Sequence, residues 1–525
     1  MPKVLISDKM SKRAKEIFKA RGIDVDVKTG MSEDELIACI GDYDGLAVRS
    51  ATKATQKVLD AASNMKVIGR AGIGVDNIDV AAATARGIVV MNTPFGNAIT
   101  TAEHAIAMMM ALARQIPEAN ASTHAGKWEK SRFMGVELTA KTLGIVGCGN
   151  IGSIVADRAL GLKMKVVAFD PFLSVERARE IGVEKVELDE LLRRADFISL
   201  HTPLTDQTRG IIDADAIAKT KPGIRIINCA RGGLVVEADL KAAMESGHVA
   251  GAAFDVFEVE PAKDNALFGM ENLVCTPHLG ASTDEAQVNV AIQVAEQMAD
   301  YLLDGAVVNA LNMASVSAED APRLMPYMKL AGLLGSFAGQ LTESGLKSVT
   351  IEYEGHAAEL NIKPLSAAVL QGLLSPLLDS VNMVNAPVKA SERGIDVSEV
   401  QTDREGDYQT LIRLTVVTDK QTRSVAGTLF GGDRPRVVDV KGVPMEAELG
   451  SHMLYVTNED QPGLIGGLGT VLGDAGLNIA TFQLGRNKPG GDAIALVEVD
   501  QAVPADVLVK VTKLPNVVQA KALNF

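Results

Sequence analysis

Short apolar runs alternate with amphipathic stretches through residues 3–95 of the chain. The apolar runs predict four strands, at Lys3–Ser7, Leu46–Arg49, Lys66–Gly69 and Gly87–Met91. Two amphipathic stretches between them, Lys12–Ala20 and Glu33–Ile40, predict helices. This βαβ alternation is typical of a parallel sheet covered by helices. A long apolar helix is expected next, over Ile99–Arg114, before the polar stretch Gln115–Gly135.

The same alternation begins again at residue 143. It predicts six strands, at Leu143–Gly147, Val166–Asp170, Phe197–His201, Arg225–Cys229, Gly251–Asp255 and Leu273–Thr276. Six strands in which the first leads into a glycine-rich turn are typical of a doubly wound dinucleotide-binding domain. A helix near Asp284–Leu303 closes this unit. Because one sheet interrupts the other, we expect a cofactor domain inserted into a substrate domain.

The polar segment Ala314–Pro322 breaks the pattern and predicts a linker. A helix over Tyr327–Ser344 follows it. Alternating apolar and polar positions then predict strands at Ser348–Tyr353, Leu411–Thr418, Thr422–Leu429 and Arg436–Val440. These residues form no catalytic constellation, so we expect an α+β domain whose ligand the sequence does not disclose.

The end of the chain predicts a small domain of its own. Its expected elements, in the order βαββαβ, are Met453–Val456, Pro462–Ala475, Asn478–Arg486, Ala493–Val499, Pro504–Leu514 and Val517–Leu523. That order is typical of a ferredoxin-like fold. The expected fold class is therefore α/β, with two doubly wound parallel-sheet domains followed by an α+β domain and a ferredoxin-like domain. The expected domain boundaries are 1–98 with 286–313, 99–285, 320–445 and 452–525.

Composition narrows the range of partners. The chain has 525 residues and a formal charge of −14, which argues against binding DNA or anionic membranes without specific contacts. The N-terminus opens directly into a strand and predicts no signal peptide, and no apolar run reaches the length of a membrane span. Four scattered cysteines with no CxxC pair are typical of free thiols in a reducing compartment, so we expect a cytoplasmic protein.

A glycine-rich loop, Gly147–Gly152, lies between a predicted strand and a predicted helix. In this GxGxxG pattern Gly147 permits a tight turn, Gly149 lets a pyrophosphate approach the backbone, and Gly152 allows close packing of helix on strand. The helix N-terminus then offers free N–H groups to the phosphate charge. Asp170 ends the next strand, where a carboxylate accepts bonds from ribose hydroxyls and repels a 2′-phosphate, so NAD is favoured over NADP.

Three side chains that follow later strands suggest chemistry. Arg231 follows the strand that ends at Cys229, and a guanidinium at the carboxyl edge of a parallel sheet can hold a carboxylate in two parallel bonds. His278 also stands just past a strand, and Glu260 lies in the loop after Asp255. A carboxylate on the far imidazole nitrogen fixes the tautomer and favours the protonated ring, which tunes an acid–base group near neutral pH.

Together these motifs closely resemble the D-isomer-specific 2-hydroxyacid dehydrogenases. The matching stretches are Gly147–Gly152, His201–Leu204, Asn228–Gly233, Phe254–Pro261 and Pro277–Ser282. Further stretches point to the long-form members of the family, which carry two extra C-terminal domains: Val48–Thr52, Gly69–Asn77, Met91–Pro94, Gly126–Glu129 and Phe133–Gly135. The resemblance covers essentially the whole chain.

The resemblance implies roles for individual residues. Arg231, Glu260 and His278 would be the catalytic residues, and His278 would take the substrate's hydroxyl proton while the hydride leaves for NAD. Asp255 would face the nicotinamide carboxamide. Including it, the implied cofactor contacts are Gly147, Gly149, Asn150, Ile151, Gly152, Asp170, Thr202, Cys229, Ala230, Arg231, Asp255, His278, Leu279, Gly280 and Ala281.

The implied substrate is 3-phosphoglycerate, oxidised to 3-phosphohydroxypyruvate at the first step of serine synthesis. Its phosphate needs cations, and Arg49 and Arg70 stand at the ends of first-domain strands, with Asn92 as a further expected contact. The C-terminal domain resembles an ACT domain, which binds amino acids where two copies pair. Serine is the implied effector, at Asn458, Asp460 and Asn478. A homo-oligomer, either a dimer or a tetramer, is also implied.

Two other functions remain open from the sequence. One is another D-2-hydroxyacid dehydrogenase, such as a hydroxypyruvate or glyoxylate reductase, although the two first-domain arginines and the C-terminal domain argue against it. The other is an NAD-sensing corepressor of the same fold, although the chain has no basic segment. We interpret the histidines outside the site, His104 among them, as structural, and we expect no metal because no cluster has ligand-like spacing.

Overall fold

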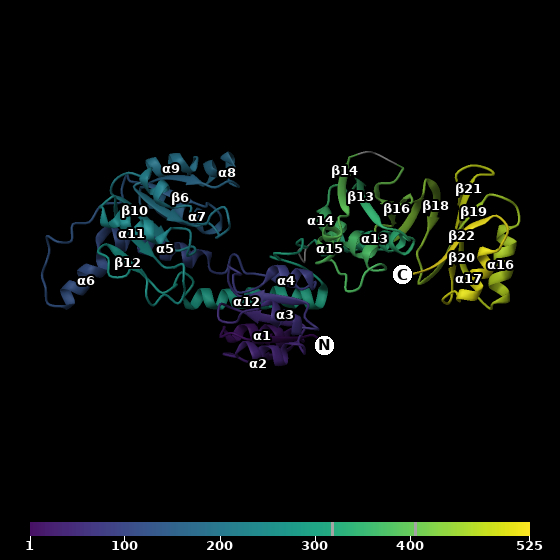
Figure 1. Cartoon of the computed structure of the whole chain (residues 1–525), viewed down its shortest axis with the longest axis horizontal. Coiled ribbons are helices and arrows are strands. Elements are labelled where there is room, and N and C mark those ends of the chain that lie inside the picture. Colours follow the sequence, from purple (N-terminus) through teal and green to yellow (C-terminus); the bar gives the residue numbers. More distant parts are fainter. Residues whose placement is uncertain (317–319, 404–406) are drawn as a thin grey trace.

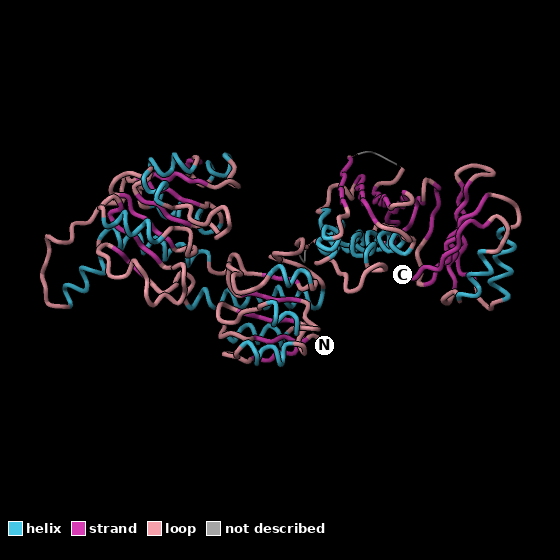
Figure 2. Tube along the Cα trace, in the orientation of Figure 1, coloured by secondary structure: helices cyan, strands magenta, loops and turns pink. Residues whose placement is uncertain are grey.

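The computed structural model describes residues 1–316, 320–403 and 407–525. Its strands form four sheets that follow one another along the chain, each flanked by helices (Figures 1 and 2). In this described part of the chain, no helix combines the length and apolar character needed to cross a bilayer.

The first sheet has five parallel strands in the order β2-β1-β3-β4-β5. They are β1 (Lys3–Ile6), β2 (Asp24–Val27), β3 (Gly45–Val48), β4 (Val67–Arg70) and β5 (Val89–Met91). The helices between them are α1 (Lys12–Ala20), α2 (Glu33–Ile40), α3 (Gln56–Ala61) and α4 (Val80–Ala85). The sequence pattern did not predict β2, which is an edge strand of alternating aspartate and valine with little apolar character.

A helix from much later in the chain completes the first domain. The buried face of α12 (Asp284–Asp304), with Val290, Val294 and Met298, packs in the same core as Val4 and Val67 of the sheet. Figure 1 shows this helix, in teal, running beside the purple N-terminal elements. The second sheet therefore interrupts the first domain, as the order of the predicted elements indicated.

The second sheet has seven parallel strands in the order β12-β11-β10-β9-β6-β7-β8. They are β6 (Thr142–Val146), β7 (Lys165–Phe169), β8 (Glu184–Lys185), β9 (Phe197–Leu200), β10 (Ile224–Asn228), β11 (Val249–Phe254) and β12 (Leu273–Cys275). The strand order reverses beside β6, and this is the switch point at which doubly wound sheets bind ligands. All six predicted strands are confirmed, and the two-residue strand β8 is added at the edge.

Helices cover both faces of the second sheet. They are α5 (Ala98–Arg114), α7 (Asn150–Gly161), α8 (Val175–Glu180), α9 (Leu188–Arg194), α10 (Ala214–Ala218) and α11 (Glu237–Glu245). The helix α6 (Ile116–His124) follows α5 and extends away from the sheet (Figure 1). Ala105, Met109 and Leu112 of α5 pack in one core with Ile145 of β6 and Ala253 of β11. The stretch after Arg114, predicted as simply polar, begins with α6, where Pro117 occupies the first turn.

The third sheet is mixed, in the order β14-β13-β15-β16-β17-β18. Its elements are α13 (Ala321–Gln340), β13 (Leu346–Gly355), α14 (Ile362–Leu374), α15 (Ala386–Glu392), β14 (Asp396–Thr402), β15 (Thr410–Thr418), β16 (Thr422–Phe430), β17 (Arg434–Val440) and β18 (Val443–Ala447). The predicted linker is too long at its end, because Ala321 and Pro322 already begin α13; residues 317–319 of it lie outside the described residues. The predicted bounds of that helix, Tyr327–Ser344, lie several residues too late.

The fourth sheet is antiparallel, in the order β20-β21-β19-β22, and confirms the expected ferredoxin-like fold. Its elements are β19 (His452–Glu459), α16 (Leu464–Asp474), β20 (Ile479–Arg486), β21 (Asp492–Val499), α17 (Ala505–Thr512) and β22 (Val517–Asn524). In Figure 1, α16 and α17 cover the face of this sheet that points away from β18. The opposite face, with Tyr455 and Leu496, packs in one continuous core with Phe337 of α13 and Val443 of β18.

Candidate active site between the two parallel sheets

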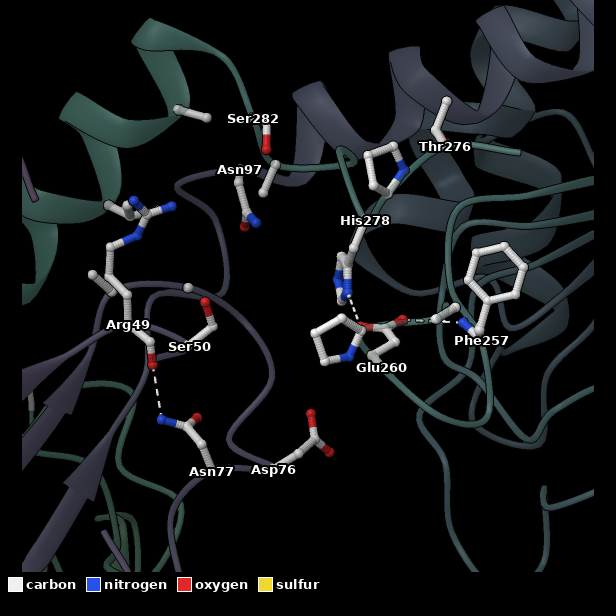
Figure 3. Close-up of a pocket in the computed structure, with 18 of the residues that line it drawn as sticks. Arg49, Ser50, Asp76, Asn77, Asn97, Phe257, Glu260, Thr276, His278 and Ser282 are labelled. Atoms are coloured by element: carbon white, nitrogen blue, oxygen red, sulfur yellow. Dashed lines mark hydrogen bonds and ion pairs between the residues drawn. The ribbon is translucent and has the colours of Figure 1, made fainter. Parts of the chain in front are cut away.

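A large cavity that brings titratable groups together lies where the carboxyl ends of the first two sheets face each other. It has a volume of about 780 Å³, and its lining includes Arg49 and Arg70 from the first sheet and Glu260 and His278 from the second. Figure 3 shows Arg49 on one side of this space and the His278–Glu260 pair on the other. Residues from both domains therefore meet over one volume.

His278 and Glu260 form the closest acid–base pair in this cavity. His278 Nδ1 lies 2.7 Å from Glu260 Oε2, and the other carboxylate oxygen accepts a 3.0 Å bond from the backbone N–H of Phe257. The bond to Glu260 raises the pKa of His278 against the effect of burial. Burial pushes the pKa of Glu260 upward, but the bonds from His278 and Phe257 outweigh it and hold that pKa below its ordinary value. The ring nitrogen Nε2 is left as the one to meet a ligand.

Arg231 follows β10 in a turn held by Asn228. The Asn228 side chain accepts from the backbone N–H of Ala230 at 3.1 Å and donates to the carbonyl of Arg231 at 2.9 Å. The guanidinium reaches toward the first domain, where its Nε lies 3.3 Å from Asp76 Oδ2. A Cβ on Gly74 would overlap Arg231 Nη2, so a larger residue at 74 would displace the guanidinium from this position. Asp76 lies in the stretch Gly69–Asn77 that resembles the family, but the sequence predicted no role for this residue.

The residues predicted to bind the cofactor gather around a second cavity of about 600 Å³. Those that line it are Asn150, Ile151, Thr202, Cys229, Ala230, Arg231, Asp255, His278, Gly280 and Ala281. Gly147 has φ +89°, and a Cβ on Gly152 would overlap the carbonyl oxygen of Gly147, so both positions require glycine. A Cβ on Gly149 would meet nothing within 4 Å, so the loop stays open above the N-terminus of α7. This cradle fits a dinucleotide.

Asp170 follows β7, and in the structure its carboxylate has backbone donors. One oxygen accepts from the N–H of Cys148 in the glycine-rich loop at 2.8 Å, and the other accepts from Phe172 at 2.8 Å. These bonds place the carboxylate beside the loop that would hold a pyrophosphate. A contact with the ribose hydroxyls remains a prediction.

Asp255 has a different setting from the one expected. Its side chain is completely buried and accepts bonds from the Thr276 hydroxyl at 2.6 Å and from the N–H groups of Leu279 at 2.7 Å and Gly280 at 2.8 Å. His104 Nε2 lies 3.2 Å away. Its contact with the nicotinamide carboxamide therefore stays a prediction, whereas its hold on the loop after His278 is part of the structure.

The expected phosphate contacts differ in how they are placed. Arg70 lies in the cavity wall, and burial, together with repulsion from Arg231 and Arg49, lowers its pKa to about 10. Its Nε is buried without a partner among the described residues. Asn92 is not part of either cavity's lining; it is buried, and its amide donates to the carbonyl of Ile73 at 2.6 Å. Through this bond Asn92 holds the loop that follows Arg70 and carries Asp76.

A single chain does not bring the three predicted effector residues together. Asn458 ends β19 opposite Ala493, whereas Asn478 precedes β20, whose first residue pairs with Val499 at the other end of β21. Asn478 donates instead to Asp500 at 2.8 Å, and Asp460 accepts from Arg486 at 2.8 Å. The sequence predicted one site where two copies pair, and did not specify which copy supplies which of these residues. Asn458 Oδ1 is buried without a partner among the described residues.

Among residues 1–316, 320–403 and 407–525, no three His, Cys, Asp or Glu side chains come together as a metal site requires.

Comparison with known proteins agrees with this geometry. Three family models match the chain: the NAD-binding domain of the D-isomer specific 2-hydroxyacid dehydrogenases over residues 106–280, the D-3-phosphoglycerate dehydrogenase intervening domain over 323–441, and the ACT domain over 452–516. Among solved structures, a glyoxylate reductase from Paecilomyes thermophila is 30% identical with a TM-score of 0.56, covering 59% of this chain and 98% of its own. D-lactate dehydrogenase from Escherichia coli is 27% identical with a TM-score of 0.53, covering 59% and 100%.

Curated relatives extend over the whole chain. The D-3-phosphoglycerate dehydrogenase of Synechocystis is 46% identical, covering 100% of this chain and 95% of its own length. Those of Bacillus subtilis and Methanocaldococcus jannaschii are 43% and 42% identical, and each comparison covers 100% of both chains.

The fold and the site thus define an NAD-dependent dehydrogenase of D-isomer specific 2-hydroxy acids. The second sheet, with its glycine-rich loop, lies within the matched NAD-binding domain. Within it, the chain belongs to the D-3-phosphoglycerate dehydrogenases, in the form that carries an intervening and an ACT domain. The resemblance, the fold class and the NAD cofactor predicted from the sequence are confirmed.

Proposed function

We propose that the chain oxidises D-3-phosphoglycerate to 3-phosphohydroxypyruvate with NAD, the first step of serine synthesis. The observation that carries this proposal is the cavity itself, in which Arg49 and Arg70 face the His278–Glu260 pair across one space. A three-carbon acid with a phosphate at one end and a carboxylate at the other needs cations at both ends of the molecule, on either side of the reacting carbon. The division into domains at 1–98 with 286–313, 99–285, 320–445 and 452–525 is part of the proposal.

The roles of the three catalytic residues follow from their bonds. Arg231 binds the substrate carboxylate through Nη2, because Nε pairs with Asp76 and Nη1 donates to the carbonyl of Ala230. Glu260 holds His278 through Nδ1, so Nε2 takes the proton of the substrate hydroxyl. Bound NAD supplies the acceptor for the hydride. In the reverse direction the protonated ring returns the proton to the carbonyl oxygen.

The direct test is the initial rate of NADH formation with 3-phosphoglycerate and NAD, compared with the rate of NADH oxidation on hydroxypyruvate and glyoxylate. A preference for the phosphorylated acid supports the proposal. Preference for the unphosphorylated acids would favour the reductase alternative. Intact NAD binding with no turnover on any acid would favour a corepressor.

Replacing Arg70 by alanine should raise KM for 3-phosphoglycerate roughly 10- to 100-fold, the loss expected for a hydrogen bond between charged groups. The KM for an unphosphorylated 2-hydroxy acid should change far less, because only the phosphate needs this cation. Steady-state kinetics on both substrates measures the difference. Arg21→Ala is the control, because Arg21 pairs with Asp300 on the outside of the same domain. Equal losses on both substrates would refute a phosphate role.

Replacing Glu260 by glutamine should shift the acid limb of the kcat/KM profile for oxidation to lower pH. The hydrogen bond to Glu260 and the charge of that carboxylate raise the pKa of His278, and glutamine can still accept a bond from Nδ1 but carries no charge. Oxidation needs neutral His278, so a lower pKa extends activity toward acid. Reduction needs protonated His278, so its alkaline limb should move in the same direction. Unchanged limbs would show that Glu260 does not set this pKa.

We further propose that L-serine inhibits the enzyme at a site shared by two ACT domains. Asn458 and Asp460 lie at one end of the sheet and Asn478 at the other, so an antiparallel pairing of two β20 edges would bring Asn478 of a second copy toward Asp460. The N-terminus of α16, capped by Gly463 without a side-chain bond, offers N–H groups to a carboxylate.

Initial rates with and without millimolar L-serine test this site. We expect inhibition that Asn478→Ala and Asp460→Asn both weaken while the uninhibited rate is kept, with D-serine as the ligand control. Turnover indifferent to serine would leave the ACT domain as an assembly module.

We also propose that the chain forms a homo-oligomer, either a dimer or a tetramer. Two exposed apolar side chains lie in the segment after α6, Trp128 at 86% exposure and Met134 at 78%. Such a surface on a dehydrogenase domain is typical of contact with a second copy. The molar mass in solution distinguishes monomer, dimer and tetramer. All four cysteines are free thiols, which is compatible with a cytoplasmic enzyme.

A further inference from the structure

The loop that carries His278 is anchored to a single buried carboxylate. Asp255 is fully buried, and the three residues after Pro277 all depend on it: its backbone carbonyl accepts from the N–H of His278 at 2.9 Å, and its side chain accepts from Leu279 and Gly280. His278 itself has φ +56°, a left-handed conformation that non-glycine residues adopt at some cost. The orientation of the imidazole therefore depends on how firmly Asp255 is held.

His104 is the side chain that approaches Asp255 from the opposite side. It projects from the middle of α5 and is mostly buried, with its Nε2 3.2 Å from Asp255 Oδ1 and 3.1 Å from Thr276 Oγ1. These three groups come from three separate segments, namely α5, the end of β11 and the end of β12. They close a compact network directly beneath the loop.

The direction of each bond follows from the number of protons. The Thr276 hydroxyl has one proton, and at 2.6 Å it donates that proton to Asp255 Oδ1. Its oxygen can then only accept from His104. A carboxylate also only accepts, so His104 Nε2 must carry a proton and donate to this pair. Without His104, Thr276 and Asp255 would both lose a donor on a side that water reaches poorly.

We propose that His104 is a positioning residue for the reaction: it donates from Nε2 to the Asp255–Thr276 pair and so fixes the loop that presents His278. His104 does not line the substrate cavity or the cofactor cavity, so it acts through Asp255 and not by touching the substrate. This inference rests on the proposed role of His278 in proton transfer and adds a residue from a different helix to that machinery.

Three variants test the role of the donor. His104→Leu keeps a side chain of similar breadth but removes the donor, whereas His104→Gln places an amide nitrogen where Nε2 stood. His248→Leu is the matched control, because His248 Nε2 makes the same kind of contact, 3.0 Å from Thr220 Oγ1, at the opposite end of β11. For each variant we would measure kcat and KM for 3-phosphoglycerate at saturating NAD, the Kd for NADH by fluorescence, and the melting temperature.

The expected result is a kcat about 10- to 100-fold lower in His104→Leu, the scale expected when a catalytic group is misplaced by an ångström or less. The KM for 3-phosphoglycerate should stay nearly unchanged, because the arginines that bind the substrate are untouched. His104→Gln should recover most of the kcat, and His248→Leu should keep it even if its melting temperature falls.

Three outcomes would overturn the proposal. They are an undiminished kcat in His104→Leu, an equal loss in His104→Leu and His104→Gln, or a loss that disappears once a weakened NADH affinity is compensated by more cofactor. If the unmodified enzyme itself turned over no 2-hydroxy acid, the proposed function would fail first. In that case NADH affinity and melting temperature would still report whether His104 holds the loop.

Discussion

His278→Asn should lower kcat for 3-phosphoglycerate oxidation by about 100- to 10 000-fold, the range expected when a positioned general base is lost. The asparagine amide can occupy the place of Nδ1 and still donate to Glu260, but it offers no base where Nε2 meets the substrate. Asparagine also tolerates the left-handed backbone at this position, φ +56°, so the loop should keep its shape. Initial rates of NADH formation measure the loss.

The Kd for NADH and the KM for 3-phosphoglycerate should change little in this variant, because the substitution leaves Arg70, Arg231 and the glycine-rich loop intact. His124→Asn, on the exposed helix α6, is the control and should behave as the unmodified enzyme does. A residual kcat above a tenth of the original would mean that another group takes the proton.

Arg231→Gln should lower kcat/KM for 3-phosphoglycerate by about 100-fold, since the loss of a hydrogen bond between charged groups costs up to about 3 kcal/mol. Arg231→Lys should recover only part of it, because an ammonium keeps the charge but lacks the planar fork that grips a carboxylate. The fold should not suffer, because the ion-pair partner Asp76 is 73% exposed and remains hydrated when left alone.

Arg225→Gln is the matched control for this experiment. Arg225 stands on the same strand, β10, and its guanidinium lies against the ring of Phe197 and away from the cavity. A loss of kcat/KM as large in Arg225→Gln as in Arg231→Gln would indicate a damaged sheet and would contradict the carboxylate role.

The sequence predicted much of this site because parallel sheets have a simple geometry. Loops after neighbouring parallel strands meet at one edge, so Arg231, Asp255 and His278 could be placed together from strand order alone. The contact of His104 with Thr276 spans 172 residues and depends on how α5 lies on the sheet. No periodicity in the chain encodes that, and a histidine on an apolar helix was reasonably interpreted as structural.

Other differences have similar physical causes. The helix α14 was not predicted because it is apolar on nearly every side and shows no amphipathic stripe. The copy that supplies each effector residue was not predicted, because the βαββαβ order fixes the fold but not the register that puts Asn458 and Asn478 at opposite ends. Asp76 went unassigned because its partner, Arg231, belongs to the other domain.

The third and fourth sheets share one apolar interior, in which the ring of Phe337 meets that of Tyr455 edge-on at 5.8 Å. The side-chain amide of Gln340 also bonds to both backbone groups of Asn524, at 2.7 and 2.9 Å, much as a neighbouring strand would. Removing either domain would leave a broad exposed apolar surface on the other. Although their sequences read as two domains, an effector bound at the end of the chain would thus act on one rigid unit. That unit contacts the catalytic half directly, because Asn382 donates to the carbonyl of Gly87 at 2.8 Å and Val384 packs in the core of the first domain.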